Sequence, residues 1–543
     1  MLFEAKNGEK NHLKLFTNEN YNHKLSLRKT EISKYFMKKR RIISLDYSIP
    51  NPNFLQVDDA NIILTNLQSS LISLDAFEMD KYISISIQYI NKYQSNATKR
   101  NELLNNESIN ICDIAYRIFT LNNVSELIAY KSSMLILSIS FVSQKMTNLL
   151  ATHDAFTYIV NTSIPKYENN PQIISEIILF LGNTITDGND NISILDMIFH
   201  TKYLNKLCDL LSIAQNMKNE QSYAVRVMVN GIVWNIYLII DSISKFDEGN
   251  NDENIYINQY LDVFTDFATN LLNLIEFYST MNSNDELETF LQTLFFLSQN
   301  DEIAISMIKN DLFIKYSILF EYLFKEDINC ESTLILDSKC VEYIVLTFGN
   351  IFTQSDELIN AYYNDVFGVI FGKLIMRHRI FSQANIKLQC ALMRLYGNCA
   401  AFPTNTALVN FIGDLERIQI IFKYYTSSEI ISDIFFALEN IFFVQSYDVV
   451  DTYIACGAFT ILKSVFSSNT NNDVIILCFK VLLKAVECSK RIVSKEIGKY
   501  IENKGIYEDA KKIALQNKNQ KVEKIATQFI ELFDKEIKKD NLY

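Results

Sequence analysis

The chain has 543 residues, a formal net charge of −12 at pH 7 and 48% hydrophobic residues. It contains only 13 Gly and 5 Pro, which is too little turn-forming sequence for an all-β or α/β chain of this length. The composition therefore favours an all-α fold. Nine cysteines occur without any C-x-x-C pair, which indicates reduced thiols in a cytosolic or nuclear protein.

The first 44 residues form a basic arm in front of an acidic body. Residues 1–41 contain 11 Lys/Arg against 4 Asp/Glu, whereas the other 502 residues contain 40 against 59. Such an arm is a solvated tail, a nucleic-acid-binding segment or a segment that recognises acidic protein surface. We expect no nucleic-acid partner, because the anionic body would repel a polyanion.

Residues 45–60 are predicted to be a flexible linker between the arm and the body. Pro50 and Pro52 preclude a helix, and Asp58 and Asp59 keep the segment solvated.

The sequence carries no catalytic or membrane signature. The five histidines do not form an H-E-x-x-H motif, and neither G-x-S-x-G nor a phosphate-binding glycine loop occurs. The most apolar stretch, Ala224–Ile240, is interrupted by Arg226, Asn230 and Asn235. We therefore expect no enzyme activity, no cofactor, no metal and no membrane insertion.

Similar segments recur along the body. Each has an apolar approach, an asparagine after Gly or Glu, and a polar turn: LGNTITDGND from Leu181, FGNIFTQSDE from Phe348, YGNCAAFPTN from Tyr396 and LENIFFVQSYD from Leu438. Weaker copies lie at Asn235 and at FFLSQND, residues 295–301. A period of about 40–47 residues, with insertions such as KFDEGNNDEN at 245–254, predicts an all-α solenoid of the armadillo or HEAT kind over residues 61–540.

The recurring asparagines allow two interpretations. Each could satisfy backbone groups near a helix end, or together they could form a ladder of amides along a groove. Because an amide both donates and accepts hydrogen bonds, such a ladder could hold an extended peptide by its backbone. Glu176 and Asp433 lie seven residues before an asparagine, and Asp187 and Asp356 lie shortly after one. An acidic groove of this kind would select a lysine-rich peptide.

Over almost its whole length the chain resembles the importin-α (karyopherin-α) family. The arm pattern L-R-K, eight residues and a basic cluster is matched by Leu27-Arg28-Lys29 and Lys38-Lys39-Arg40-Arg41. LGNTITDG is similar to a motif of the family's third repeat, and FGNIFTQSDE is similar to a motif of its sixth repeat. The stretch that begins at Gly498 is similar to the family's closing repeat. The resemblance implies a right-handed armadillo-repeat superhelical solenoid of about ten repeats with a flexible basic N-terminal arm.

The resemblance also implies a function. The family consists of nuclear import adapters, which shuttle between cytoplasm and nucleus. They bind basic localisation signals of cargo proteins and couple them to an importin-β-type carrier, and a nuclear export receptor recycles them. The alternative is an armadillo scaffold, a protein-interaction module that has lost localisation-signal binding.

Site residues follow from the same resemblance. The peptide-binding residues would be Glu176, Asn183, Asp187, Asn235, Asn350, Asp356, Asn398, Asp433, Phe436 and Asn440. The residues for importin-β binding and autoinhibition would be Arg28, Lys29, Lys38, Lys39, Arg40 and Arg41. The family's groove tryptophans are replaced, by Leu179, Gly231 and Arg394 among others, but Phe436 keeps an aromatic ring. The minor site around Asp433 is therefore expected to be better preserved than the major site around Asp187.

Overall fold

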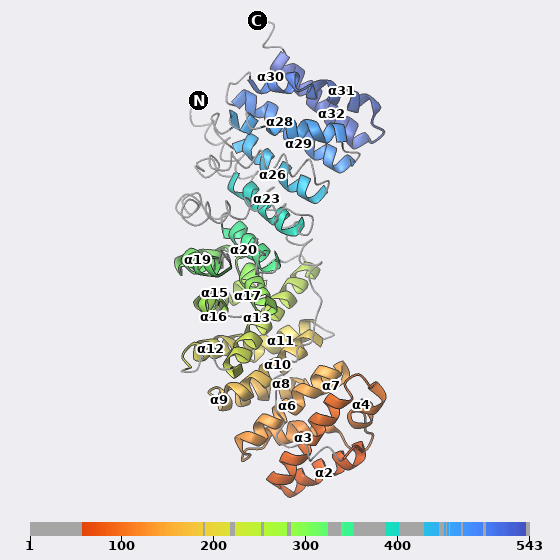
Figure 1. Ribbon diagram of the computed structural model, residues 1–543, viewed down its shortest axis with the longest axis vertical. Helices are drawn as coiled ribbons and strands as arrows, with labels where there is room; N and C mark the ends of the chain where they lie inside the picture. Colours follow the sequence, from red (N-terminus) through yellow and green to blue (C-terminus); the bar gives the residue numbers. More distant parts are fainter. Residues whose placement is uncertain are drawn as a thin grey trace, which may run out of the picture. The chain divides into compact units, whose positions relative to one another are not determined.

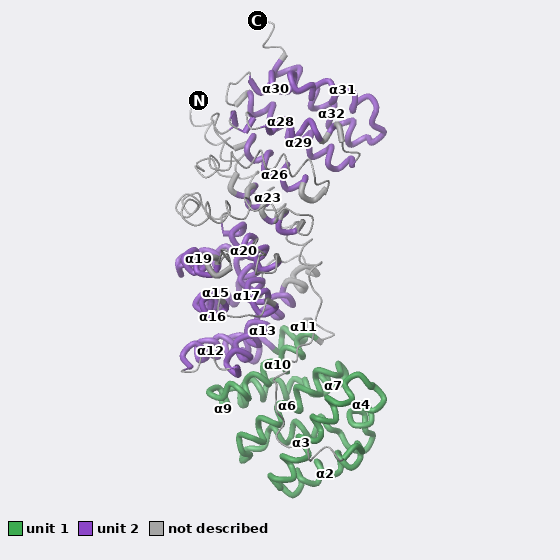
Figure 2. The backbone as a smooth tube through the Cα atoms, in the orientation of Figure 1, with its two compact units in different colours: residues 1–197 green, residues 198–543 purple. Residues whose placement is uncertain are grey.

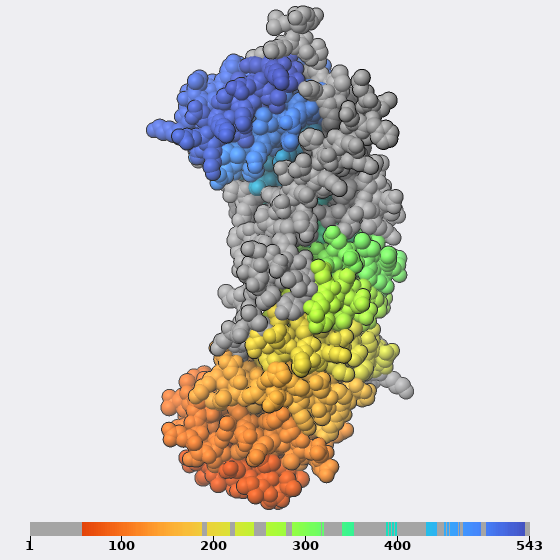
Figure 3. Space-filling model, turned by 180° about the vertical axis from the view of Figure 1, so that it is seen from behind, coloured from red at the N-terminus to blue at the C-terminus, as the bar shows by residue number. Residues whose placement is uncertain are grey.

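The computed structural model describes most of the body. The described residues are 57–187, 191–217, 223–250, 255–279, 284–323, 338–351, 386–400, 428–444, 450–451, 453–454, 457–468, 471–491 and 496–538. Figure 3 colours them by position along the chain and leaves the others grey. The predicted arm and most of the predicted linker lie outside this set. The described residues form helices and turns without any strand, so the all-α prediction is confirmed for them.

The chain divides into two compact units, residues 1–197 and 198–543 (Figure 2). The helices of the first unit are α2 (Ala60–Ser73), α3 (Ala76–Lys92), α4 (Ala97–Leu104), α5 (Ile111–Thr120), α6 (Glu126–Val142), α7 (Gln144–Leu150), α8 (His153–Tyr158), the π-helix η2 (Ile159–Ser163), α9 (Ile164–Tyr167) and α10 (Pro171–Asp187). Helix α11 (Asn191–His200) contains the boundary between the units.

The second unit continues the same succession of helices. Its members are α12 (Tyr203–Gln215), α13 (Tyr223–Asn250), α14 (Ile255–Gln259), α15 (Leu261–Asn273), α16 (Ile275–Ser279), α17 (Asn284–Leu297), α18 (Asp301–Lys309), α19 (Leu312–Leu323), α20 (Ser338–Ile351), α23 (Ile386–Ala400), α26 (Ser428–Val444), α28 (Ala458–Ser468), α29 (Asn472–Arg491), α30 (Glu496–Asn503), α31 (Ile506–Gln516), α32 (Gln520–Phe533) and the π-helix η4 (Asp534–Lys538).

One helix from each repeat packs against its counterpart in the next repeat. We call these the row helices. In the first unit they are α3, α6 and α10, and in the second unit α13, α17, α20, α23, α26, α29 and α32, each in contact with the next within its unit (Figure 1). Because a single repeat cannot bury its apolar faces alone, this stacking supplies the core. In α26, for example, Ile434, Phe435 and Leu438 are all at most 2% exposed.

Helix α13 is mostly apolar and is largely buried from Val225 to Ile243. By length and composition alone it could cross a membrane, but 78% of its most apolar window is buried within the protein. It packs against α12 and α17, and Trp234, the one tryptophan of the chain, is only 3% exposed there. A mostly apolar helix that its neighbours cover in this way belongs to the core. It also continues to Asn250, into the polar insertion at 245–254.

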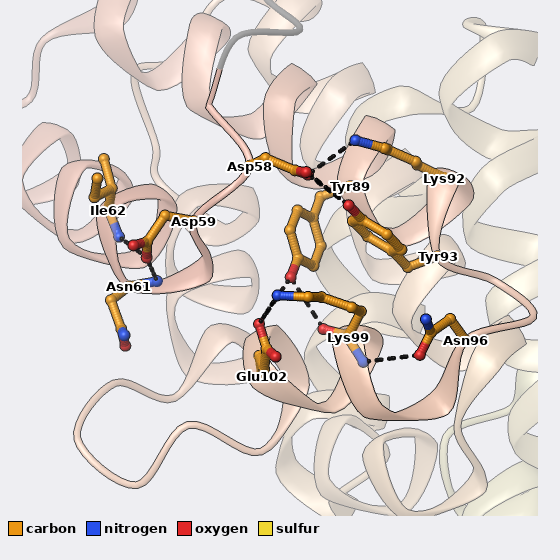
Figure 4. A network of polar contacts seen from close by, with 10 residues as sticks. All are labelled: Asp58, Asp59, Asn61, Ile62, Tyr89, Lys92, Tyr93, Asn96, Lys99 and Glu102. Carbon is orange, nitrogen blue, oxygen red and sulfur yellow. Dashed lines mark hydrogen bonds and ion pairs between the residues drawn. The ribbon is translucent and has the colours of Figure 1, made fainter.

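Helix α2 begins at Ala60, the last residue of the predicted linker. Asp59 precedes α2 and caps it, because its carboxylate accepts hydrogen bonds from the backbone N–H groups of Asn61 at 2.8 Å and Ile62 at 3.3 Å (Figure 4). These are the N–H groups that a helix leaves without an internal partner in its first turn.

Asp58 fastens the start of the body to the end of α3. Its carboxylate accepts from the Tyr93 hydroxyl at 2.7 Å and from the Lys92 ammonium at 3.0 Å (Figure 4). The Tyr93 hydroxyl and, after it, Lys92 hold the pKa of the Asp58 carboxyl below its usual range. Asp58 and Asp59 are both exposed, as expected, and both also bind the folded body.

A strained position lies between α2 and α3 and can be tested directly. Leu74 has φ of 55°, in the left-handed region, and is 63% exposed, whereas the nearby Ile72 is helical and 77% exposed. Leu74→Gly should stabilise this corner by about 0.5–1 kcal/mol by removing the Cβ strain. Ile72→Gly should destabilise it by about 0.5–1 kcal/mol.

Amide hydrogen exchange of α2 in the two full-length variants measures this difference. Slower exchange in Leu74→Gly and faster exchange in Ile72→Gly are expected. A shift of both variants in the same direction would show that the backbone at Leu74 is not strained.

Candidate functional site

The recurring asparagines of α23 and α26 connect neighbouring row helices. The Nδ2 of Asn440 donates to the backbone oxygen of Gly397 at 2.8 Å, and the Nδ2 of Asn398 donates to the backbone oxygen of Gly349 at 3.0 Å. Gly397 and Gly349 directly precede Asn398 and Asn350 in sequence. The G-N pair is therefore a two-part connector, whose glycine accepts from the following repeat and whose asparagine donates to the preceding one.

Two further asparagines make the same kind of contact through a hydroxyl group. Asn350 of α20 donates to the Oγ of Ser298, which directly follows α17, at 3.0 Å. Asn183 of α10 donates to the Oγ of Ser140 in α6 at 3.2 Å. In four cases, then, the amide reaches back to the preceding row helix or to its end.

Asn235 is used differently. Its Nδ2 donates to the backbone oxygen of Gly231, one turn earlier in α13, at 2.8 Å. Its Oδ1 accepts from the Tyr203 hydroxyl of α12 at 3.0 Å. Burial raises the pKa of Tyr203 well above its usual value, so this hydroxyl keeps its proton and donates. Asn235 therefore joins two helices of one repeat.

The exposure of the five asparagines differs from the predicted surface ladder. Asn183 and Asn235 are fully buried and Asn440 is 1% exposed, whereas Asn350 and Asn398 are half-buried. The physical reason is that the amides satisfy polar groups inside the stack, where an unmade hydrogen bond would cost about 1–3 kcal/mol. A role of these asparagines in peptide binding stays a prediction.

Phe436 lies against the glycine of the preceding repeat. A Cβ atom at Gly397 would come within 2.4 Å of the Phe436 Cδ1, so only glycine leaves room for the ring. The ring is half-buried. The ring therefore lies against Gly397 in α23, and its role in peptide binding stays a prediction.

Asp433 of α26 is already paired within the protein. The Nε of Arg394 in α23 lies 3.1 Å from its Oδ1 and 3.2 Å from its Oδ2. The side chains of Arg394 and Asp433 are 19% and 4% exposed. We expected this carboxylate to be available to a lysine of a bound peptide, but in the structure an arginine four residues before Asn398 occupies it.

Other acids of the row helices are paired in the same way. Across adjacent row helices the shortest ion-pair distances are 2.5 Å for Lys131–Asp80, 2.6 Å for Arg226–Glu286 and 3.3 Å for Lys339–Glu288. These pairs were not predicted from the sequence. Their signal is a basic residue on α6, α13, α20 and α23, but the acidic partner comes from another repeat 39–60 residues away.

The remaining predicted site residues are placed only in part. Glu176 lies in α10 and is 3% exposed, and Asp187 is the last residue of the same helix. The side chain of Asp187, the whole of Asp356 and the six arm residues lie outside the described residues. Within the described residues no cluster of His, Cys, Asp and Glu could hold a metal ion.

The chain is similar to several solved structures. An engineered protein determined by a structural-genomics consortium matches with a TM-score of 0.58 and 14% identity, over 88% of this chain and 99% of that one. A structure from work on the cadherin–β-catenin interaction matches with a TM-score of 0.55 and 12% identity, over 88% and 83%. A designed armadillo-repeat protein in complex with the peptide (KR)4 matches with a TM-score of 0.38 and 16% identity, over 48% and 99%.

The chain has the armadillo-repeat fold. No protein-family model matches the sequence. No curated protein sequence matches it either. At the identities found, the structural likeness concerns the armadillo architecture alone.

The close contact at Gly397 can be tested by substitution, with Gly349 as the control position. Gly397→Ala should destabilise the protein by about 1–3 kcal/mol, because the new methyl group collides with the Phe436 ring. At Gly349 a Cβ would meet only the Nδ2 of Asn398, at an ordinary 3.7 Å. Gly349→Ala should therefore stabilise α20 by about 0.5–1 kcal/mol, as alanine usually does inside a helix.

The measurement is the urea-unfolding midpoint of each full-length variant, with and without Phe436→Ala. Removing the ring should abolish the cost of Gly397→Ala and leave the effect of Gly349→Ala unchanged. Equal costs of Gly397→Ala in both backgrounds would contradict the contact.

Proposed function

We propose that this armadillo protein is a nuclear import adapter, which holds a lysine-rich segment of a cargo protein along its row helices. In this proposal the basic N-terminal arm binds an importin-β-type carrier. The protein would shuttle between cytoplasm and nucleus, and an export receptor would return it. In more general terms, this function is that of a protein-interaction scaffold.

The observation that carries the proposal is the register of half-buried amides on adjacent row helices. Asn350 and Asn398 occupy equivalent places in α20 and α23, 48 residues apart, and both keep some solvent exposure. The Nδ2 of Asn398 makes one hydrogen bond to Gly349, whereas an amide group has two donor hydrogens and two acceptor lone pairs. Amides repeated in this way can bind the regularly spaced backbone groups of an extended peptide.

Charge supports a basic ligand over an acidic one. The chain beyond residue 41 has 19 more acidic than basic residues, which favours the approach of a cationic peptide through long-range attraction. The spacing of Leu27-Arg28-Lys29 and the cluster from Lys38 to Arg41 supports a carrier-binding role for the arm.

A second candidate function is an armadillo scaffold without localisation-signal binding. The Arg394–Asp433 ion pair favours it, because this pair removes an acid that a cargo lysine would need. The two candidates differ in the arm, since a scaffold without import activity has no need of a carrier-binding segment.

Carrier binding therefore tests the import proposal. Replacing Lys38, Lys39, Arg40 and Arg41 together by alanine in the full-length chain should weaken binding to an importin-β-type carrier at least about 10-fold. The same change should flatten the dependence of affinity on salt, because fewer charges are screened. Surface-based binding measurements between about 0.05 and 0.3 M salt give both quantities.

The matched control removes the same charge elsewhere. It carries alanine at four exposed lysines of the last repeat, Lys504, Lys518, Lys521 and Lys524, and should bind the carrier within about twofold of the unaltered chain. If the unaltered chain does not bind the carrier at low salt, or if both variants lose affinity equally, the import function is wrong and the scaffold function is favoured.

A further inference from the structure

We propose that Arg394 competes with the ligand for Asp433. By occupying this carboxylate, Arg394 determines that the α23–α26 face has no preference for a peptide lysine beside Asp433. The inference rests on the proposed binding of basic peptides to the row helices. It concerns a specificity-determining residue of that same face.

The geometry of the pair shows how the competition works. The Arg394 Nε lies almost equally far from the two carboxylate oxygens of Asp433, at 3.1 and 3.2 Å. Asp433 is only 4% exposed, so little of its carboxylate faces solvent while the guanidinium is in place. A peptide lysine would have to displace the guanidinium first, and the exchange of one cation for another yields little free energy.

The position of the pair distinguishes it from the other ion pairs of the row helices. Arg394 lies four residues before the half-buried Asn398, one turn away on the same helix face. Arg226 lies nine residues before Asn235, and the acid that it binds, Glu286, is 19% exposed. Among these described pairs, the Arg394 pair is the one that adjoins a partly exposed row asparagine.

Stability gives no sufficient reason for an ion pair at this place. A buried pair is often replaced by apolar residues without loss of stability, because removing two charges from water costs about as much as their attraction returns. Removing one partner alone has a different effect, since it leaves a buried charge without compensation. Without Arg394, Asp433 would therefore bind an external cation strongly.

The experiment measures the affinity of full-length protein for a fluorescein-labelled octalysine peptide by fluorescence anisotropy. Arg394→Met keeps an unbranched apolar chain but removes the guanidinium, and it should tighten binding at least about 10-fold. Arg394→Met with Asp433→Asn should return the affinity to within about twofold of the unaltered protein. Reversal by the second change would show that the gain acts through Asp433.

Arg117→Met is the control for net charge. It also removes one positive charge from an ion pair, but Arg117 and its partner Asp113 are 66% and 57% exposed, so the acid is already solvated. Its effect on peptide affinity should stay within about twofold.

Asp433→Asn alone tests the inference even if Arg394→Met fails to fold. Because Arg394 already occupies the carboxylate, this change should alter octalysine affinity by less than about twofold. A loss of about 10-fold or more would overturn the inference, because Asp433 would then contact the peptide in the unaltered protein.

The outcomes separate this inference from the proposed function. If the unaltered protein binds octalysine and Arg394→Met does not bind it more tightly, the inference is overturned and the import proposal stands. If only Arg394→Met binds, the inference stands and the import proposal loses its peptide site. If a folded Arg394→Met variant and the unaltered protein both fail to bind, both proposals are overturned.

Discussion

Within each unit the row helices pack against one another, and close approach of neighbouring backbones is the constraint on which that packing depends. At α23 and α26 the approach is possible because residue 397 has no side chain: the Phe436 ring lies where a Cβ would be, and the Asn440 amide reaches the Gly397 oxygen at 2.8 Å. A larger residue would separate the helices and break the hydrogen bond. The glycine therefore determines both the packing and the polar contact.

The same constraint limits what the surface of the row helices can do. An amide that satisfies a neighbouring backbone oxygen has one fewer hydrogen for a ligand, and an amide buried as deeply as Asn183 or Asn440 is out of reach while the stack is intact. Leaving such groups unpaired would cost stability at every repeat. Stacking and the proposed peptide recognition thus compete for one residue type, and in that proposal the partly exposed amides of Asn350 and Asn398 contact the ligand.

The acidic side chains of the row helices are also divided between pairing within the stack and the proposed contact with a ligand. The body is strongly acidic as a whole, yet acids on the row helices, such as Glu286 and Asp433, are matched by a cation from the adjacent row helix. Net charge acts at long range and steers a ligand, whereas the preference at a given position depends on whether the local carboxylate already has a partner. A face can therefore attract basic peptides and still lack a lysine-selective position.

The sequence by itself determined the all-α class, the repeat and the places of the row asparagines. Scarce glycine and proline and a period of about 40–47 residues are visible along the sequence alone, and the apolar spacing before Asn440 is a property of one helix. The sequence did not predict the amide contacts between row helices. It also did not predict the contact of Phe436 with Gly397 or the pairing of Arg394 with Asp433. The contacts between repeats join residues that are 39–52 positions apart in the chain. Only the tertiary stacking of the repeats decided which side chains meet and how much of each remains exposed.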